Sequence, residues 1–167
     1  MPPVTMSLGA EMELIGAGGA SRSVAANDFL LGPLETAREE NEILLSINMP
    51  AAPANAGSAY KKWGLVTDAL PVIGVCAYVE LDGSGACTSA RVAIGGLGDG
   101  PAHSGAAAAA LVGNKGNDAD AISAALDAAA NETETQGDLW ADPAYRKQLI
   151  RSLGTEVVTT AFQRAAS

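Results

Sequence analysis

The sequence predicts an α+β fold, in which an antiparallel sheet of three to four strands is covered on one face by about three helices. Strand-like segments gather before about residue 95, and helix-like segments follow from about residue 104. A tight glycine turn joins two of the strand-like segments directly, and this connection requires antiparallel strands. A chain of 167 residues has room for one core of ordinary size, not for two full domains.

The first third alternates short strand-like runs with turns. Residues 11–15 (EMELI) and 21–26 (SRSVAA) flank a GAGG stretch, an arrangement that is typical of a β-hairpin. The following NDFLLG stretch predicts a turn anchored by Phe29. Residues 41–50 predict a strand that ends at its final proline, because proline cannot donate the next backbone hydrogen bond.

The middle of the chain predicts three strands, after a linker of small residues (AAPANAG). We expect them at about 58–66, 72–81 and 87–95. The DGSG stretch at 82–85 is a tight turn whose glycines can adopt positive φ. The second and third of these strands should therefore form an antiparallel hairpin.

The last third predicts helices. Residues 104–113 open on a serine and close on a glycine, and residues 118–132 are rich in alanine with one apolar stripe. Residues 142–166 open with Asp142 as N-cap and a proline at the first helical position. We expect Gly154 to break this last segment into two helices.

Composition excludes several classes of partner. The formal net charge of −9 opposes binding to nucleic-acid phosphates or to anionic membranes. The chain has neither a signal-peptide pattern nor an apolar run of the roughly 18 residues that span a membrane, so we expect a cytoplasmic protein. Aromatic residues make up only 4%, so the core must be built from Ala, Val, Ile and Leu.

Few residues have the spacing of a metal or catalytic site. Cys76 and Cys87 lie eleven positions apart with no CxxC pair, so we expect two reduced thiols in neighbouring strands and no metal site. His103 is the only histidine and has no spaced partner. The acidic run that ends in Glu42 is interpreted as a solvated turn with local caps. We predict no catalytic residue in this chain.

Two glycine-rich stretches can be interpreted either as phosphate-binding loops or as ordinary turns and loops. The GAGG stretch is followed by a strand pattern and not by a helix, which favours the hairpin turn. In residues 95–105 (GGLGDGPAHSG), Pro101 stands where a dinucleotide fingerprint needs an uninterrupted helix start, so this stretch is expected to be a loop.

Taken in order, the segments resemble the FAD-binding medium subunit of the molybdenum hydroxylases, the family of aerobic carbon monoxide dehydrogenase and xanthine dehydrogenase. The resemblance runs through nearly the whole chain. It rests on Asp28-Phe29, Thr36, Glu42-Ile43-Leu44, the Tyr60-x-Lys62 pair, the IGG stretch at 94–96 and Tyr145-Arg146. It implies that residues 1–50 are the C-terminal end of the FAD-binding domain and that residues 57–167 are the C-terminal domain of the CO dehydrogenase flavoprotein type. It also implies that the N-terminal half, which holds the FAD pyrophosphate, is missing.

The resemblance implies a flavin-facing set of residues: Leu44, Lys61, Lys62, Asp68 and Leu70. A cation near the electron-poor end of the flavin ring would favour the anionic reduced form, and leucines would pack against the ring faces. The alternative is that the lysine pair is an ordinary surface feature preceding a hairpin. The resemblance implies no metal ligand in this chain.

The resemblance also implies partners. Electrons would pass from a molybdenum cofactor on a large subunit, through iron–sulfur clusters on a small subunit, to FAD and on to an external acceptor. The chain would be a component of an FAD-dependent oxidoreductase and inactive in isolation. The alternative function is a non-catalytic assembly module that kept the fold and lost the flavin.

Overall fold

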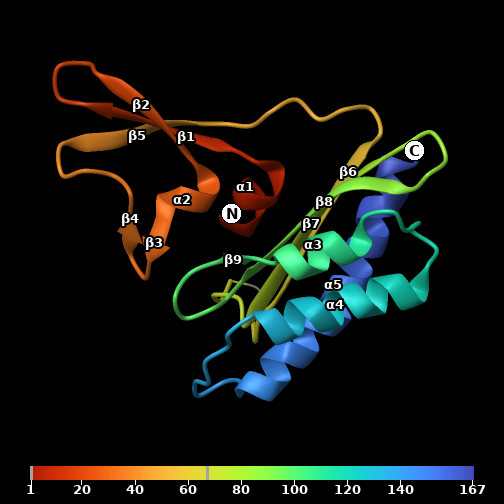
Figure 1. Cartoon of the computed structure of the whole chain (residues 1–167). Helices are drawn as coiled ribbons and strands as arrows, with labels where there is room; N and C mark the ends of the chain where they lie inside the picture. Colours follow the sequence, from red (N-terminus) through yellow and green to blue (C-terminus); the bar gives the residue numbers. More distant parts are fainter. Residues whose placement is uncertain (1, 67) are drawn as a thin grey trace.

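The computed structural model describes residues 2–66 and 68–167 and has an N-terminal β-rich part and a C-terminal α+β part (Figure 1). The N-terminal part contains one three-stranded sheet, in the order β2-β1-β5, and a small two-stranded sheet of β3 and β4. Its elements are α1 (Pro2–Leu8), β1 (Glu11–Gly16), β2 (Ser21–Ala25), α2 (Ala26–Phe29), β3 (Leu30–Gly32), β4 (Glu35–Thr36) and β5 (Glu42–Asn48).

The C-terminal part is an antiparallel sheet in the order β6-β7-β8-β9, with three helices on one face. This arrangement confirms the predicted fold class, and β7 and β8 form the predicted hairpin. The first strand ends at Trp63, three residues earlier than expected. The elements are β6 (Ala56–Trp63), β7 (Ile73–Leu81), β8 (Cys87–Gly95), β9 (Ala102–His103), α3 (Gly105–Leu111), α4 (Ala119–Glu132) and α5 (Pro143–Ala165).

Each of these three helices begins at a side-chain cap, and the sequence predicted two of the caps, Ser104 and Asp142. The side chains of Ser104, Asp118 and Asp142 accept hydrogen bonds from backbone N–H groups in the first turns of α3, α4 and α5. The predicted break at Gly154 is wrong, because α5 runs without interruption to Ala165. Gly154 instead allows close packing, since a Cβ there would lie 2.3 Å from a methyl carbon of Leu126 on α4.

The main core lies between the sheet and its three helices. Strand β7 is central and contributes fully buried Ile73, Val75 and Val79, while α5 contributes Ile150 and Val158. The burial of these aliphatic side chains supplies the main favourable term in folding. The core has few aromatic members, as the composition predicted.

The opposite face of the sheet is also partly covered, which the sequence did not predict. Helix α1 packs there, and Met6 and Ala93 join a second core cluster with the N-terminal part. Another unpredicted element is α2, a short helix where a turn was expected, although Phe29 is buried at its end as anticipated. Helix propensity is weak in both segments, so tertiary packing decides their conformation.

The β1–β2 hairpin and the strand β5 are confirmed. Gly18 and Gly19 both have positive φ at the hairpin turn, which identifies GAGG as a turn between strands. Strand β5 lies at the edge of its sheet, and a β-bulge interrupts its pairing with β1. Several of its apolar side chains are exposed.

Helix α5 lies directly on the backbone of β6 at Gly57. A Cβ at this position would lie 2.1 Å from the carbonyl oxygen of Ala161 and 2.4 Å from the backbone nitrogen of Ala165. Backbone atoms cannot rotate away as side chains can, so only glycine permits this approach.

Gly57→Ala should therefore lower the free energy of unfolding by about 3 kcal/mol, because α5 must move away from the sheet. Urea denaturation followed by circular dichroism measures this loss. Gly83→Ala is the matched control, since a Cβ at Gly83 meets no atom within 4 Å. Equal midpoints for the two variants would contradict the direct contact of α5 with β6.

The predicted solvated acidic turn is wrong at Glu42, which is buried and ion-paired. Arg22 Nε donates to Glu42 Oε1 at 2.7 Å, and Arg22 Nη2 donates to Oε2 at 2.8 Å. The Glu39 backbone N–H also donates to this carboxylate at 2.7 Å. The Arg22 hydrogen bond, followed by that of Glu39, lowers the pKa of Glu42 from 4.5 to about 2.

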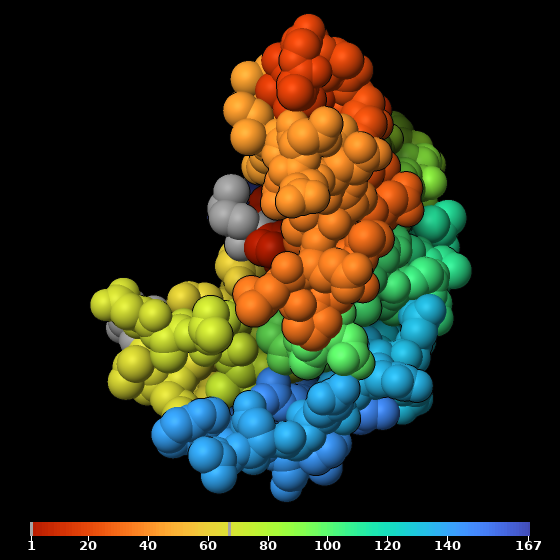
Figure 2. Space-filling view, turned by 90° about the vertical axis from the view of Figure 1, so that its left-hand side faces the viewer, coloured from red at the N-terminus to blue at the C-terminus, as the bar shows by residue number. Residues whose placement is uncertain are grey.

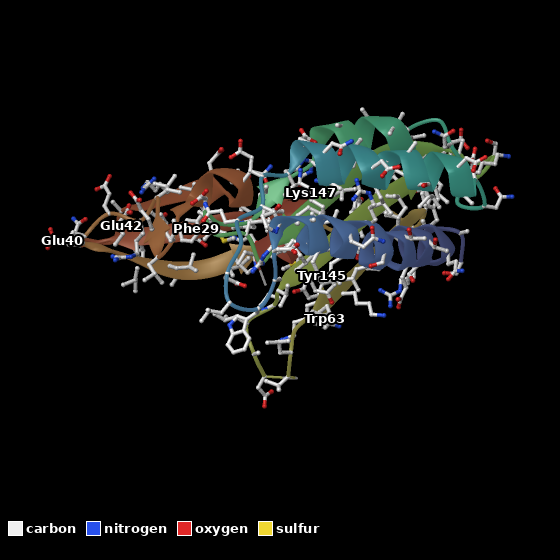
Figure 3. The ribbon with its side chains drawn as sticks, turned by 90° about the horizontal axis from the view of Figure 1, so that it is seen from below. Phe29, Glu40, Glu42, Trp63, Tyr145 and Lys147 are labelled. Atoms are coloured by element: carbon white, nitrogen blue, oxygen red, sulfur yellow. The ribbon has the colours of Figure 1, made fainter. Side chains whose placement is uncertain are left out.

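Because this pKa is lower in the folded state, the Glu42 contribution to stability is present above pH 4.5 and is lost as the pH falls toward about 2. Glu42→Gln should reduce the dependence of the urea midpoint on pH across this interval. The neighbouring exposed Glu40, labelled with Glu42 in Figure 3, provides the control variant Glu40→Gln. If both variants keep the pH dependence of the parent, the Arg22–Glu42 pair does not contribute in this way.

Candidate functional site

A cavity of about 620 Å³ lies at the end of the four-stranded sheet where β6 and β8 end and β7 begins. Figure 2 shows the β6–β7 connection projecting from the body, with a hollow between it and the N-terminal part. Three connections and the start of α1 contribute to the wall. The lining residues are Pro2, Pro3, Tyr60, Lys62, Leu70, Pro71, Gly95, Gly96, Leu97, Gly98, Gly100, Pro101, Gln136, Gly137, Asp138 and Arg146.

Tyr60 and Lys62 reach this cavity from the same face of β6. They are two residues apart, and alternate residues of a strand share a face. Tyr60 pairs with Cys76 and Lys62 with Gly74 on β7. A Cβ at Gly74 would lie 2.8 Å from the Tyr60 hydroxyl oxygen, so glycine makes room for the tyrosine ring. Partial burial raises the pKa of the Tyr60 hydroxyl, which therefore stays protonated at neutral pH.

The two neighbouring lysines point to opposite faces of the sheet. Lys61 pairs with Val75, whose side chain lies in the core beneath the helices, and the Lys61 ammonium forms an ion pair with Glu156 of α5. Lys61 is not among the cavity-lining residues, whereas Lys62 is. The structure thus separates the pair that the resemblance left undecided.

Of the other three residues predicted to face the flavin, one lines the cavity and two do not. Leu70 lines the cavity and is 90% exposed, and the Lys62 ammonium donates to the Ala69 carbonyl oxygen in the same connection at 3.4 Å. Asp68 is exposed on this connection, and Leu44 lies on β5, but neither lines the cavity. The structure therefore brings together Lys62 and Leu70, and the flavin contacts themselves stay predictions.

The glycine-rich loop after β8 forms another wall. Gly96 has a φ of +84°, and a Cβ there would lie 2.7 Å from the carbonyl oxygen of Val72. The loop therefore packs directly against the end of the β6–β7 connection. The sequence identified this stretch as a loop but did not predict that it faces Tyr60 and Lys62.

The sequence also missed the contribution of the α4–α5 connection and of Arg146. Arg146 is buried in the first turns of α5, donates to the carbonyl oxygen of Gly96 at 2.8 Å and forms an ion pair with Asp138. The adjacent Tyr145 packs edge-on against Trp63, with ring centroids 5.8 Å apart. Both residues are labelled in Figure 3. The Tyr145-Arg146 pair contributed to the family resemblance, which was the available signal for this anchor.

The cysteines and the histidine that the sequence analysis considered do not form a metal site among the described residues. Within residues 2–66 and 68–167, no group of three or more His, Cys, Asp or Glu side chains is placed to hold a metal ion. Cys76 and Cys87 are free, buried and on neighbouring strands, as predicted. Burial lowers the pKa of His103, which lies on β9. Among the described helices, none is long and apolar enough to cross a membrane.

Comparison with protein families assigns both parts of the chain. Residues 58–161 match the CO dehydrogenase flavoprotein C-terminal domain, and residues 1–52 match the FAD binding domain in molybdopterin dehydrogenase. The carbon monoxide dehydrogenase medium chain of Hydrogenophaga pseudoflava is 28% identical over 99% of this chain. The carbon monoxide dehydrogenase medium chain of Afipia carboxidovorans is 45% identical over a match that covers 37% of this chain and 21% of the relative.

Solved structures agree with the sequence matches. A carbon monoxide dehydrogenase from Hydrogenophaga pseudoflava, which lacks the Mo-pyranopterin moiety of the molybdenum cofactor, superposes with a TM-score of 0.89 at 29% identity over 98% of this chain and 56% of that chain. Quinoline 2-oxidoreductase from Pseudomonas putida 86 superposes with a TM-score of 0.88 at 26% identity over all of this chain and 57% of that chain.

The chain spans 56% of the Hydrogenophaga pseudoflava medium chain, so the match leaves out a large part of that relative. The family match over 58–161 covers most of this chain, and the preceding match accounts for its N-terminal part. The chain therefore belongs to the CO dehydrogenase flavoprotein C-terminal domain family, and with it to the FAD-binding medium subunits of the molybdenum hydroxylases.

Proposed function

We propose that this chain forms one wall of the FAD site in the flavoprotein subunit of a molybdenum hydroxylase. The observation that carries the proposal is the cavity where Lys62, Tyr60 and Leu70 meet the glycine-rich loop after β8. Its volume of about 620 Å³ lies within the range of roughly 300–1,000 Å³ that is common for cofactor sites. The family of the chain supports the choice of FAD as the ligand.

The wall of the cavity fits a flavin ring. Leu70, Pro71 and Leu97 present apolar surface, as the faces of a planar aromatic ring require. Tyr60 and Lys62 add a hydroxyl and an ammonium that can donate hydrogen bonds to polar atoms at the ring edge. Leu70 is well placed to pack on the ring, because it is exposed at the mouth.

The described residues fit a pyrophosphate much less well. The start of α3 is already satisfied, because Glu132 accepts from the Ala106 backbone N–H and Ser104 accepts from that of Ala107. A phosphate there would meet the negative charge of Glu132. The GAGG turn joins two strands and precedes no helix of its own. We infer that the pyrophosphate is held by the part of the subunit that the relatives have beyond the matched region.

Strand β5 supports this division of the flavin site. It is an edge strand of its sheet and carries the exposed apolar side chains of Ile43, Leu45 and Ile47, an unusual concentration for a strand facing solvent. We propose that the remaining part of the FAD-binding domain covers this strand. The neighbouring Leu44 would then lie at the boundary between this chain and that part.

In the proposed complex, FAD would accept electrons that originate at a molybdenum cofactor and arrive through iron–sulfur clusters, and would pass them to an external acceptor. The clusters and the molybdenum cofactor would belong to a small and a large partner subunit. The present chain positions the ring through its apolar wall and holds an ammonium beside it. The oxidised substrate is determined by the molybdenum subunit.

The first test is FAD binding by fluorescence titration. We expect the isolated chain not to bind FAD in the low micromolar range, because its described residues fit the pyrophosphate poorly. A hybrid that adds the part of the Hydrogenophaga pseudoflava medium chain left out by the match should bind it. A folded hybrid that binds no FAD would contradict the proposal and favour an assembly module that has lost the flavin.

The second test is the flavin midpoint potential of the hybrid. Lys62→Met removes a positive charge from the cavity wall, so the reduced anionic flavin is less stabilised and the potential should fall by tens of millivolts. Lys61→Met is the matched control, because Lys61 lies on the opposite face of β6. Spectroelectrochemical titration measures both. An equal effect of the two substitutions, or none, would contradict the placement of Lys62 beside the ring.

A further inference from the structure

Arg146 contacts all three connections that form the cavity wall. Its side chain is buried, and one terminal nitrogen, Nη1, donates to the carbonyl oxygens of Val72 and Gly96. The other, Nη2, forms an ion pair with Asp138. Val72 ends the β6–β7 connection, Gly96 begins the β8–β9 connection, and Asp138 lies in the α4–α5 connection. A single guanidinium thus joins three segments that are far apart in the sequence.

Two of the three connections approach each other closely beside the carbonyl groups that Arg146 contacts. The carbonyl oxygen of Val72 lies 2.7 Å from where a Cβ of Gly96 would be, so the two backbones approach without an intervening side chain. Two carbonyl oxygens pointing at one place repel each other unless a donor lies between them. Arg146 supplies that donor, and its planar fork reaches a third acceptor at the same time.

Asp138 extends the arrangement outward. One of its carboxylate oxygens accepts from the backbone N–H groups of Trp140 and Ala141, and the other receives Arg146. On the far side, Gln136 donates to Asp99 in the β8–β9 connection at 3.0 Å. The α4–α5 connection is therefore held in three ways. Asp138 stabilises the turn within it, Gln136 joins it to the β8–β9 connection, and Arg146 joins it to both other connections.

We propose that Arg146 is a positioning residue that sets the spacing of the three walls, and so places Lys62 and Leu70 opposite the glycine-rich loop. The identity of the ligand as a flavin rests on the function proposed above, but the positioning role does not. Arg146 acts through backbone carbonyls and Asp138, and its own nitrogens need not touch the ligand.

Hydrogen exchange of the full chain tests the positioning role directly. In Arg146→Met, amides in all three connections should exchange about 10- to 100-fold faster, because charge-assisted hydrogen bonds that close them are lost. Arg146→Lys should recover only part of this protection, since one ammonium cannot reproduce the fork. Arg151→Met is the matched control, because Arg151 on the same helix pairs with Asp127 of α4 and is not among the residues that line the cavity.

Asp138→Asn keeps an oxygen for the Trp140 and Ala141 amides but removes the ion pair. It should speed exchange in the α4–α5 connection alone, and it serves as the test if the Arg146 variants do not fold. Exchange that rises evenly along the chain, or not at all in the connections, would overturn the proposal.

A flavin measurement separates this inference from the proposed function. In the FAD-binding hybrid, Arg146→Lys should change the visible circular dichroism of the flavin and weaken its binding about tenfold, whereas Arg151→Met should do neither. Localised exchange together with an unchanged flavin signal would leave the cavity organised by Arg146 but would place the flavin elsewhere. An unchanged exchange pattern would refute the role of Arg146 whatever the flavin does.

Discussion

The direct packing of α5 on the sheet is the constraint on which the rest of this structure depends. At its C-terminal end the helix backbone contacts the backbone of β6, and Gly57 is required there because no Cβ has room. At its N-terminal end the helix carries Tyr145 and Arg146 to the point where the strands end. Because both ends of the helix are anchored, the loops at that end of the sheet have a defined surface to pack against.

The cavity follows from this constraint. The strands of an antiparallel sheet are joined by loops at their ends, and a group of such loops at one end of the sheet is a usual place for a binding site. Here two of those connections begin or end within reach of the first turns of α5, and their carbonyl groups are gathered by one arginine. The helix therefore does more than cover the sheet, because it also determines the relative positions of the residues proposed to face the flavin.

The sequence predicted most of the C-terminal part correctly, because its signals are local. Caps at Ser104 and Asp142 mark two helix starts, and the turn before β8 specifies a hairpin. The prediction failed at Gly154, where the helix propensity of glycine is outweighed by close packing on α4. It also failed at α1 and at Glu42, whose conformation and burial depend on partners distant in the sequence.

The candidate site was only partly predictable for the same reason. The alternation of side chains along a strand places Tyr60 and Lys62 on one face and Lys61 on the other, but the sequence does not say which face meets a cavity. The structure decides this point by placing Lys61 beside Glu156 of α5. The roles of Gly96 and Asp138 depend on contacts across the fold, so no local pattern could have identified them.

The most direct test of the proposed flavin wall is a comparison of FAD with ADP by nuclear magnetic resonance, using the FAD-binding hybrid with this chain isotopically labelled. ADP carries the adenosine and both phosphates without the riboflavin part, so the difference between the two ligands reports on the ring and the ribityl chain that bears it. We predict that amide shifts specific to FAD occur at residues 60–63, 70–72 and 95–100. Ring-specific shifts that avoid these segments and fall on the β1–β2 turn or on the start of α3 would contradict the account.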